Sequence, residues 1–271
     1  MKRVQGKRTV ITGGAQGIGA AIARRLAQEG ARVAVLDLNA DAASSVLPQP
    51  HIGLACDVAD EASVDRAFAR VKQAFGGVDV LVNNAGIGST PGDGMDRFYA
   101  AQAERYAQIG RGEAPTIFAD QTIHCGDAAW GRVLEVTLNG TFRCSRAAVR
   151  LMAEEGIGGA IVNIGSTAAV KGDGPLPYCA AKAAVLGLTR AMARELADRG
   201  IRVNAVNPGA TETPIYASLT EDVKQSIAAD SLMKRLANPD EIASAVAFLA
   251  GDDGSFATGS IVTVNGGAYF S

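Results

Sequence analysis

The chain has 271 residues, of which 48% are hydrophobic and 20% are charged. A chain of this length and composition buries roughly 75% of its unfolded surface and needs no metal or disulfide to fold. The 26 basic and 28 acidic residues nearly cancel, and neither sign forms a long block. This balance argues against nucleic acid or an anionic membrane surface as a partner.

Cysteine and histidine are sparse and follow no metal-binding or disulfide pattern. The cysteines are Cys56, Cys125, Cys144 and Cys179, and the histidines are His51 and His124. Without any C-x-x-C pair, neither a zinc site nor a disulfide framework is predicted. The basic N-terminus leads into no apolar stretch, and no run of about 18 apolar residues occurs. We therefore expect a soluble, cytoplasmic protein that has no metal and no membrane span.

Short runs rich in Val and Ile alternate along the chain with longer segments whose apolar residues recur every three or four positions. The runs are RTVIT, ARVAVLDL, HIGLACDV, VDVLVNNAG, GAIVNIGS, IRVNAVNPG and SIVTVNGG. This alternation is typical of β-α-β units. It predicts one α/β domain over residues 1–271, a Rossmann-type doubly wound, mostly parallel sheet of seven strands with helices on both faces. Asn238, Pro239 and Glu241 predict a helix start with a capping box.

A glycine-rich segment, TVITGGAQGIG over residues 9–19, follows the first predicted strand and opens the first predicted helix. Free backbone N–H groups and the positive helix end attract an anion there, and glycines let the backbone approach a diphosphate closely. Ala20 and Ala21 stand where a nucleotide-triphosphate loop has Lys and Ser or Thr. Asp37 ends the second predicted strand, where a carboxylate can bind an adenosine ribose. The segment therefore predicts a dinucleotide site rather than a kinase or ATPase site.

Further motifs follow in a fixed order along nearly the whole chain. They are Thr12-Gly13-x-x-x-Gly17-x-Gly19, Asp57, Asn83-Asn84-Ala85-Gly86, Asn139, Ser166, Tyr178-x-x-x-Lys182, and Asn207-Pro208-Gly209 with Thr211. In order and in position at strand ends, this series resembles the short-chain dehydrogenase/reductase family. The glycine spacing and the length of the chain resemble its compact, single-domain branch.

The resemblance implies a set of residues that bind a nicotinamide dinucleotide. They are Gly13, Gln16, Gly17, Ile18, Gly19, Asp37, Leu38, Asp57, Val58, Asn84, Ala85, Gly86, Tyr178, Lys182, Pro208, Gly209, Thr211 and Thr213. For Asp57 and Thr211 a purely local capping role is the alternative. Asp37 favours NAD, because a carboxylate repels the 2′-phosphate of NADP and no basic residue stands at Gln16 or Leu38 to offset it.

Three of the residues also predict the chemistry directly. Tyr178 and Lys182 are four apart in a helical stretch, so both side chains lie on one face and the ammonium can favour the phenolate. Tyr178 is then the general acid/base, and Ser166 holds the substrate oxygen. By resemblance, Lys182 also binds the nicotinamide ribose and Asn139 supports a water on the proton path. These four are the expected catalytic residues.

The expected function is NAD-dependent interconversion of a secondary alcohol and its ketone. Two alternatives stand beside it: a 3-oxoacyl thioester reductase of the same family, and a dinucleotide-binding protein without catalysis. The small-molecule pocket is expected after Ser166, in Gly172 to Pro177, and in a substrate loop over Gly209 to Arg235. That loop contains Ile215, Tyr216, Leu219 and Met233 together with Glu212 and Lys224.

Two long segments, Asp127 to Glu155 and Pro177 to Arg199, predict helices that are apolar on more than one face. By resemblance they pair with their copies in a homotetramer, with a dimer as the second possibility. Trp130, Phe142, Phe248 and Phe256 are expected in the core or at such an interface.

An insertion over residues 88–127 is longer than this family's connection at that place. Asp96 to Ile109 predicts a helix that Gly110-Arg111-Gly112 ends. Because the insertion leaves the fourth strand at its C-terminal end, we expect the helix to cover the substrate or nicotinamide side of the cleft. A surface ornament and an added subunit contact are the alternatives.

Overall fold

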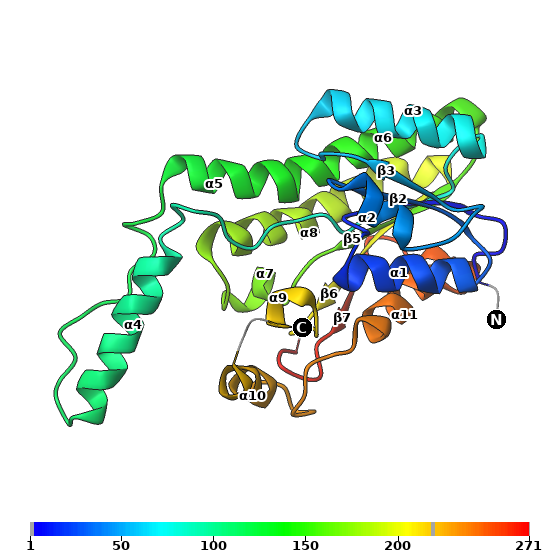
Figure 1. Ribbon diagram of the computed structural model, residues 1–271. Coiled ribbons are helices and arrows are strands. Elements are labelled where there is room, and N and C mark those ends of the chain that lie inside the picture. Colours follow the sequence, from blue (N-terminus) through cyan, green and yellow to red (C-terminus); the bar gives the residue numbers. More distant parts are fainter. Residues whose placement is uncertain (1–2, 218–219, 271) are drawn as a thin grey trace.

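The computed structural model describes residues 3–217 and 220–270 of the chain. Its centre is one seven-stranded sheet in the order β3-β2-β1-β4-β5-β6-β7, and every strand pair is parallel (Figure 1). The strands are β1 (Arg8–Thr12), β2 (Arg32–Asp37), β3 (Ile52–Ala55), β4 (Val80–Asn83), β5 (Gly159–Ile164), β6 (Ile201–Pro208) and β7 (Ile261–Val264). The predicted Rossmann-type fold is confirmed.

Helices connect the strands and cover both faces of the sheet, as right-handed β-α-β crossovers require (Figure 1). They are α1 (Gly17–Gln28), α2 (Ala40–Ser45), α3 (Glu61–Phe75), α4 (Met95–Gly110), α5 (Asp127–Leu134), α6 (Gly140–Glu155), α7 (Ala168–Lys171), α8 (Leu176–Leu196), α9 (Pro214–Ala217), α10 (Glu221–Ala229) and α11 (Pro239–Ala250). A π-helical segment (Glu135–Asn139) joins α5 to α6, and short 3-10 turns occupy Ala197–Arg199 and Asp252–Gly254.

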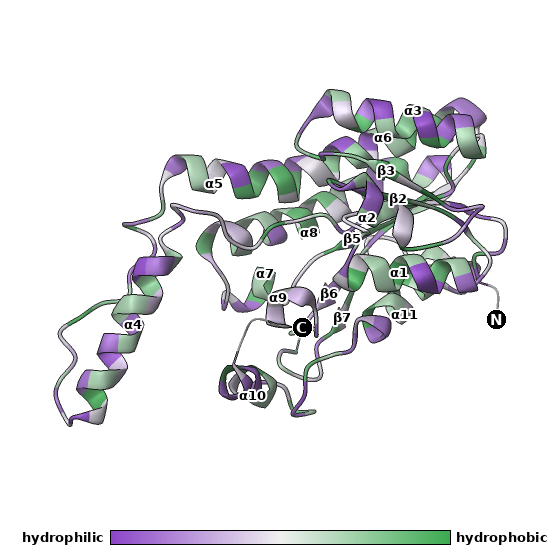
Figure 2. Cartoon of the chain, in the orientation of Figure 1, coloured by the Kyte–Doolittle hydropathy of each residue, from purple (hydrophilic) through white to green (hydrophobic). Residues whose placement is uncertain are grey.

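Two hydrophobic cores flank the sheet. One lies under α3, α6 and α8, and the other under α1 and α11. The strands contribute to both cores because successive side chains point to opposite faces. The apolar stripe of α3, Val64, Phe68, Val71 and Phe75, is buried, and α1 buries Ile22 and Leu26 but leaves Ile18 half-buried. Both helices carry purple and green bands in Figure 2, as amphipathic helices do. The packing leaves the C-terminal edge of the strands open at the crossover between β1 and β4.

The predicted helix boundaries agree with the structure at several places. Asn238 caps α11 through the Asp240 N–H, and Glu241 completes the capping box. Helical structure is continuous from Asp127 to Glu155. The four aromatic residues expected in the core or at an interface, Trp130, Phe142, Phe248 and Phe256, do not join the core: Phe142 is 46% exposed and Phe256 is fully exposed. For these residues the core alternative is wrong, and an interface stays a prediction.

The insertion forms an arm, which we define as residues 93–124. Its helix is present as predicted, with Gly112 in the left-handed region (φ 75°) just beyond the helix end. The arm projects away from the sheet (Figure 1), and no residue of α4 is buried. The expectation that this helix covers the cleft is therefore wrong. Only its first turn reaches the cavity described below.

Candidate active site

A cavity of about 980 Å³ opens at the C-terminal edge of the sheet. It is lined by loops that follow β1, β2, β3, β4, β5 and β6, which is where open α/β sheets bind their ligands. Every residue expected to bind the cofactor lines it except Gly19, and every expected catalytic residue lines it except Asn139. The fold therefore brings together residues that lie far apart in the sequence.

The glycine-rich loop fits its place only because side chains are missing. Gly13 has φ 60°, and a Cβ there would lie 2.8 Å from the Cα of Ala85. Gly17 has φ 54°, and a Cβ there would come within 3.4 Å of Thr213 Cγ2. A Cβ at that distance is an ordinary contact, so it is the positive φ that favours glycine at position 17. Gly19 lies behind the loop, where a Cβ would meet the carbonyl oxygen of Gly13 at 2.2 Å.

Two polar side chains hold this loop against its neighbours. Asp37 accepts a hydrogen bond from the backbone N–H of Ala15 at 3.0 Å. Asn84 donates from its amide nitrogen to the carbonyl oxygens of Gly13, at 2.7 Å, and Thr12, at 3.2 Å. Both side chains also line the cavity, so the same residues that shape the loop face the ligand space.

These features fit a dinucleotide. Gln16 precedes α1 without a side-chain cap, so the first N–H groups of the helix are free to bind a diphosphate. The Asp37 carboxylate supplies acceptors for ribose hydroxyls, and the cavity volume matches that of cofactor sites. Gln16, Gly17 and Ile18 would hold the diphosphate and Asp37 the adenosine ribose.

At the other end of the cavity, Tyr178 and Lys182 lie on one face of α8 and Ser166 follows β5. The ammonium nitrogen of Lys182 is 5.8 Å from the ring centre of Tyr178 and donates to the carbonyl oxygen of Ile164 at 2.6 Å. The Ser166 hydroxyl accepts from the N–H of Ala168 at 3.2 Å and lies near the Tyr178 hydroxyl, whose pKa it acts to lower. This arrangement places the Tyr178 phenol near a second hydroxyl and a buried cation.

The protonation of this pair differs from the sequence-based expectation. Burial raises the pKa of Tyr178 above its usual value, and Ser166 only opposes that rise. Burial also lowers the pKa of Lys182 to about 8. The expected depression of the Tyr178 pKa by Lys182 is therefore not found, because the ammonium is itself desolvated and is bound by a backbone carbonyl.

Asn139 does not lie with the other three expected catalytic residues. Its amide nitrogen donates to Glu135 Oε2 at 2.5 Å on the surface of the π-helical segment, away from the cavity. Val136 and Thr137 are the residues of this segment that turn inward, and Val136 lines the cavity. Thr137 is fully buried, its hydroxyl bonds the backbone N–H of Ile87 at 3.2 Å, and it lies beside Gly86. The sequence contains one indication of the contact between Asn139 and Glu135. The two residues are four apart in a helical segment, which places their side chains next to each other.

A buried polar network, which the sequence analysis did not find, lies beneath the site. Asn83 on β4 donates to Ser145 on α6 at 2.9 Å and to Asn163 on β5 at 2.8 Å. Asn163 in turn donates to Thr189 on α8 at 2.9 Å. The network ties the helix that carries Tyr178 to two central strands, since buried polar groups require such partners.

Asp57 and Thr211 have local roles as well as a place in the cavity lining. Asp57 accepts from the N–H of Ala59 at 2.9 Å, and the Thr211 hydroxyl donates to the carbonyl oxygen of Gly209 at 2.9 Å. Both residues therefore make the local hydrogen bonds that the capping alternative predicts. Cofactor binding by Asp57 and Thr211 stays a prediction.

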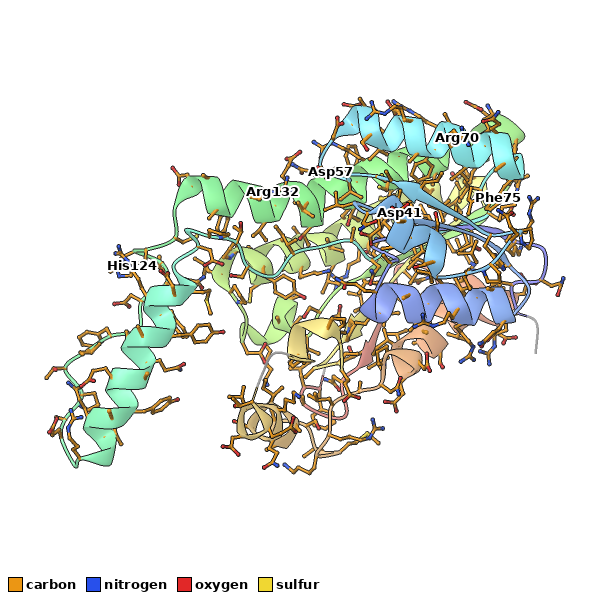
Figure 3. The ribbon with its side chains drawn as sticks, viewed as in Figure 1. Asp41, Asp57, Arg70, Phe75, His124 and Arg132 are labelled. Carbon is orange, nitrogen blue, oxygen red and sulfur yellow. The ribbon has the colours of Figure 1, made fainter. Side chains whose placement is uncertain are left out.

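The substrate end includes charged and aromatic residues that the sequence analysis did not single out, although Asp173, Asp230 and Tyr99 lie within ranges that it expected near the pocket. Lys171 forms ion pairs with Asp173, at 3.0 Å, and with Asp230, and all three line the cavity. Arg132 on α5, labelled in Figure 3, and Tyr99 on the arm also line it. Their only sequence signal was a place in or near the insertion.

Of the expected substrate-loop residues, Tyr216 and Met233 line the cavity, whereas Glu212 and Lys224 do not. Leu219 lies outside the described residues.

None of the helices in residues 3–217 and 220–270 is both long and apolar enough to cross a bilayer.

Comparisons with known proteins agree with this arrangement. A family profile described as short chain dehydrogenase matches residues 7–110, and one described as enoyl-(acyl carrier protein) reductase matches residues 107–269. The chain is 41% identical to the cis-4-hydroxycyclohexanecarboxylate dehydrogenase of Sinomonas cyclohexanicum, over 95% of this chain and 94% of the relative.

Two further relatives carry different names. The chain is 36% identical to the 3-oxoacyl-(acyl-carrier-protein) reductase of Escherichia coli, over 98% of both chains. It is 37% identical to the D-threitol dehydrogenase of Mycolicibacterium smegmatis, over 98% of this chain and 94% of the relative. The chain belongs to the short-chain dehydrogenase/reductase family, whose members are oxidoreductases that use NAD or NADP.

Proposed function

We propose that this protein is an NAD-dependent oxidoreductase that interconverts a secondary alcohol and its ketone. One observation carries the proposal: a single cavity holds the glycine-rich loop and Asp37 at one end and Ser166, Tyr178 and Lys182 at the other. Two relatives named as dehydrogenases of hydroxylated small molecules support it.

Each side chain has a defined task in this reaction. Tyr178 takes the proton of the alcohol hydroxyl during oxidation and returns a proton to the ketone oxygen during reduction. Ser166 donates a hydrogen bond to the same substrate oxygen. Lys182 binds the nicotinamide ribose and keeps a positive charge near the phenol. A bound nicotinamide dinucleotide supplies the acceptor or donor of the hydride.

The preference for NAD rests on Asp37. Its carboxylate faces the cavity and is already oriented by the Ala15 N–H. Ribose hydroxyls can donate to it, whereas a 2′-phosphate would bring a second negative charge to the same place. The neighbouring residue, Leu38, is 70% exposed and offers no compensating positive charge.

A 3-oxoacyl thioester reductase is the second candidate, because the Escherichia coli relative carries that name. Asp37 disfavours NADP, so it counts against this candidate only if the thioester reductase requires NADP. A non-catalytic dinucleotide-binding protein is the third candidate, and the filled positions Ser166, Tyr178 and Lys182 speak against it.

The test is to incubate the purified protein with NAD and a panel of secondary alcohols and to follow the absorbance of reduced nicotinamide. The panel should contain cyclic alcohols, polyols, sugars and steroids, and acyl thioesters should be tested with NADH and NADPH. Turnover of an alcohol with NAD supports the proposal. Turnover of thioesters alone favours the second candidate, and cofactor binding without any turnover favours the third.

A homotetramer, or else a dimer, is part of the proposal. Trp130 on α5 is 36% exposed and Phe142 on α6 is 46% exposed, so apolar surface on these helices is free to pair with another copy. Light scattering at micromolar protein should give the mass of a tetramer or dimer, and a monomer would contradict the assembly. A cytoplasmic location stays a prediction that fractionation of cells can test.

A further inference from the structure

The mouth of the cavity has a feature that the proposed reaction does not use. Tyr99, in the first turn of α4, and Tyr216, on α9, both line the cavity that contains Tyr178. The three phenols come from the arm, the substrate loop and the catalytic helix. Exposure increases outward, since Tyr178 and Tyr216 are half-buried and Tyr99 is 60% exposed.

These tyrosines are also electrostatic neighbours. Burial is the main cause of the raised pKa of Tyr216, and charges on Asp173 and Tyr99 add to it. Tyr216 in turn contributes to the raised pKa of Tyr178. Tyr216 is therefore near both Tyr99 and Tyr178 within the cavity that all three residues line.

Tyr99 lies near the root of the arm, which is fixed to the rest of the protein. The backbone of the arm turns sharply at Gly94, which has φ 82° and packs against His124, labelled in Figure 3. The Gln121 amide donates to the carbonyl oxygen of Asp93 at 2.9 Å, and its oxygen accepts from the N–H of Leu176 at 2.7 Å. Because Leu176 begins the helix that carries Tyr178, one side chain couples the arm to the catalytic helix.

The outer part of the arm has no such link to the cavity. Arg105 donates to the carbonyl oxygen of Ile117 at 3.2 Å, and Gln108 and Thr116 bond one another, so these contacts stay inside the arm. Tyr106, two turns beyond Tyr99, is 64% exposed and does not line the cavity. It offers a matched control on the same helix.

We propose that Tyr99 and Tyr216 are specificity-determining residues that contact the ring of a cyclic secondary alcohol while its hydroxyl reaches Tyr178. Two aromatic rings from different elements offer rigid apolar faces to a ring, at little cost in side-chain entropy. Ile227 and Met233, which also line this part of the cavity, extend the apolar contact. A flexible linear alcohol gains less binding free energy from these contacts, because its chain loses conformational freedom on binding. This inference rests on the proposed function.

The experiment compares Tyr99→Ala, Tyr216→Ala and the control Tyr106→Ala with the unchanged protein. The substrates are 2-decalol, a bicyclic secondary alcohol, and 2-decanol, a linear one with the same number of carbon atoms. We expect kcat/KM for 2-decalol to fall about tenfold in the first two variants, mainly through KM. For 2-decanol the change should stay below about threefold, and Tyr106→Ala should resemble the unchanged protein with both. Tyr99→Phe should restore most of the activity, since the ring face makes the contact.

Equal losses for both alcohols, or no loss for 2-decalol, would overturn the inference while leaving the proposed function intact. A protein that oxidises neither alcohol would count against the proposed function instead. In that case calorimetry with the ketone 2-decalone in the presence of NADH still tests the ring contact. Binding that weakens about tenfold in Tyr99→Ala but not in Tyr106→Ala supports it, and unchanged or absent binding overturns it.

Discussion

The two ends of the cavity are built in different ways. The dinucleotide end is made of backbone: Gly13 and Gly17 lie in left-handed conformations that favour glycine, and a Cβ at Gly13 would meet the backbone of Ala85. The substrate end is made of side chains from the arm, α7, α9 and the segment after α10. The backbone of the first end therefore fits a cofactor class shared by a family, whereas single substitutions can change the second end.

The largest effect is expected from Tyr178→Phe. The variant keeps the ring but removes the hydroxyl that moves the proton, so kcat should fall by roughly 10²-fold or more while NAD affinity changes little. Steady-state kinetics and titration with NAD measure the two quantities. Tyr106→Phe, far out on the arm, is the control. Retention of most activity in Tyr178→Phe would mean that another group is the acid/base.

At the dinucleotide end, Gly13→Ala should weaken NAD binding by about tenfold or more and lower the thermal midpoint. The reason is that the new Cβ would lie 2.8 Å from the Cα of Ala85, with φ at 60°. Gly131→Ala on α5 is the control, because its Cβ would meet nothing within 4 Å. Equal behaviour of the two variants would remove the claim that backbone shape defines this end.

Asp37→Ser sharpens the contrast within the same end. The unchanged protein should prefer NAD over NADP, and the variant should narrow the ratio of their kcat/KM values by at least about tenfold, because the carboxylate no longer repels the 2′-phosphate. Initial rates with both cofactors at one alcohol concentration measure this ratio. An unchanged ratio would assign cofactor choice to another residue.

A smaller effect concerns pH. The Lys182 pKa is about 8 in the folded protein and about 10.5 in the unfolded chain. Between these values the unfolded state binds more protons, so Lys182 makes the free energy of unfolding rise with pH. Cys56 acts in the opposite direction, since burial raises its pKa to about 11. The contribution of Lys182 is therefore measured as the difference in the free energy of unfolding between the unchanged protein and Lys182→Met.

Denaturant unfolding of both proteins between about pH 7 and pH 10.5 gives this difference. The stability of the unchanged protein should increase relative to Lys182→Met as the pH rises. A difference that is constant with pH would show that Lys182 is not desolvated as the structure indicates.

Sequence reasoning succeeded where backbone rules apply. The parallel seven-stranded sheet, the glycine loop, Asp37 at the end of β2 and the capping box at Asn238 follow from periodicity, spacing and capping chemistry. It was wrong where orientation depends on the fold: Asn139 faces Glu135, and the arm does not cover the cleft. A π-helical segment changes which side chains face the cavity, and the sequence pattern does not reveal it. The direction of the inserted helix depends on tertiary contacts such as the hydrogen bond between Gln121 and Leu176.

The most direct test of the proposed function follows the hydride itself. A secondary alcohol that the protein oxidises is labelled with deuterium at its carbinol carbon, and the reduced cofactor is analysed by mass spectrometry. The account predicts one deuterium in the reduced nicotinamide and a loss of this transfer of roughly 10²-fold or more in Tyr178→Phe. Reduced nicotinamide without deuterium, or equal transfer in the Tyr178→Phe variant, would contradict it.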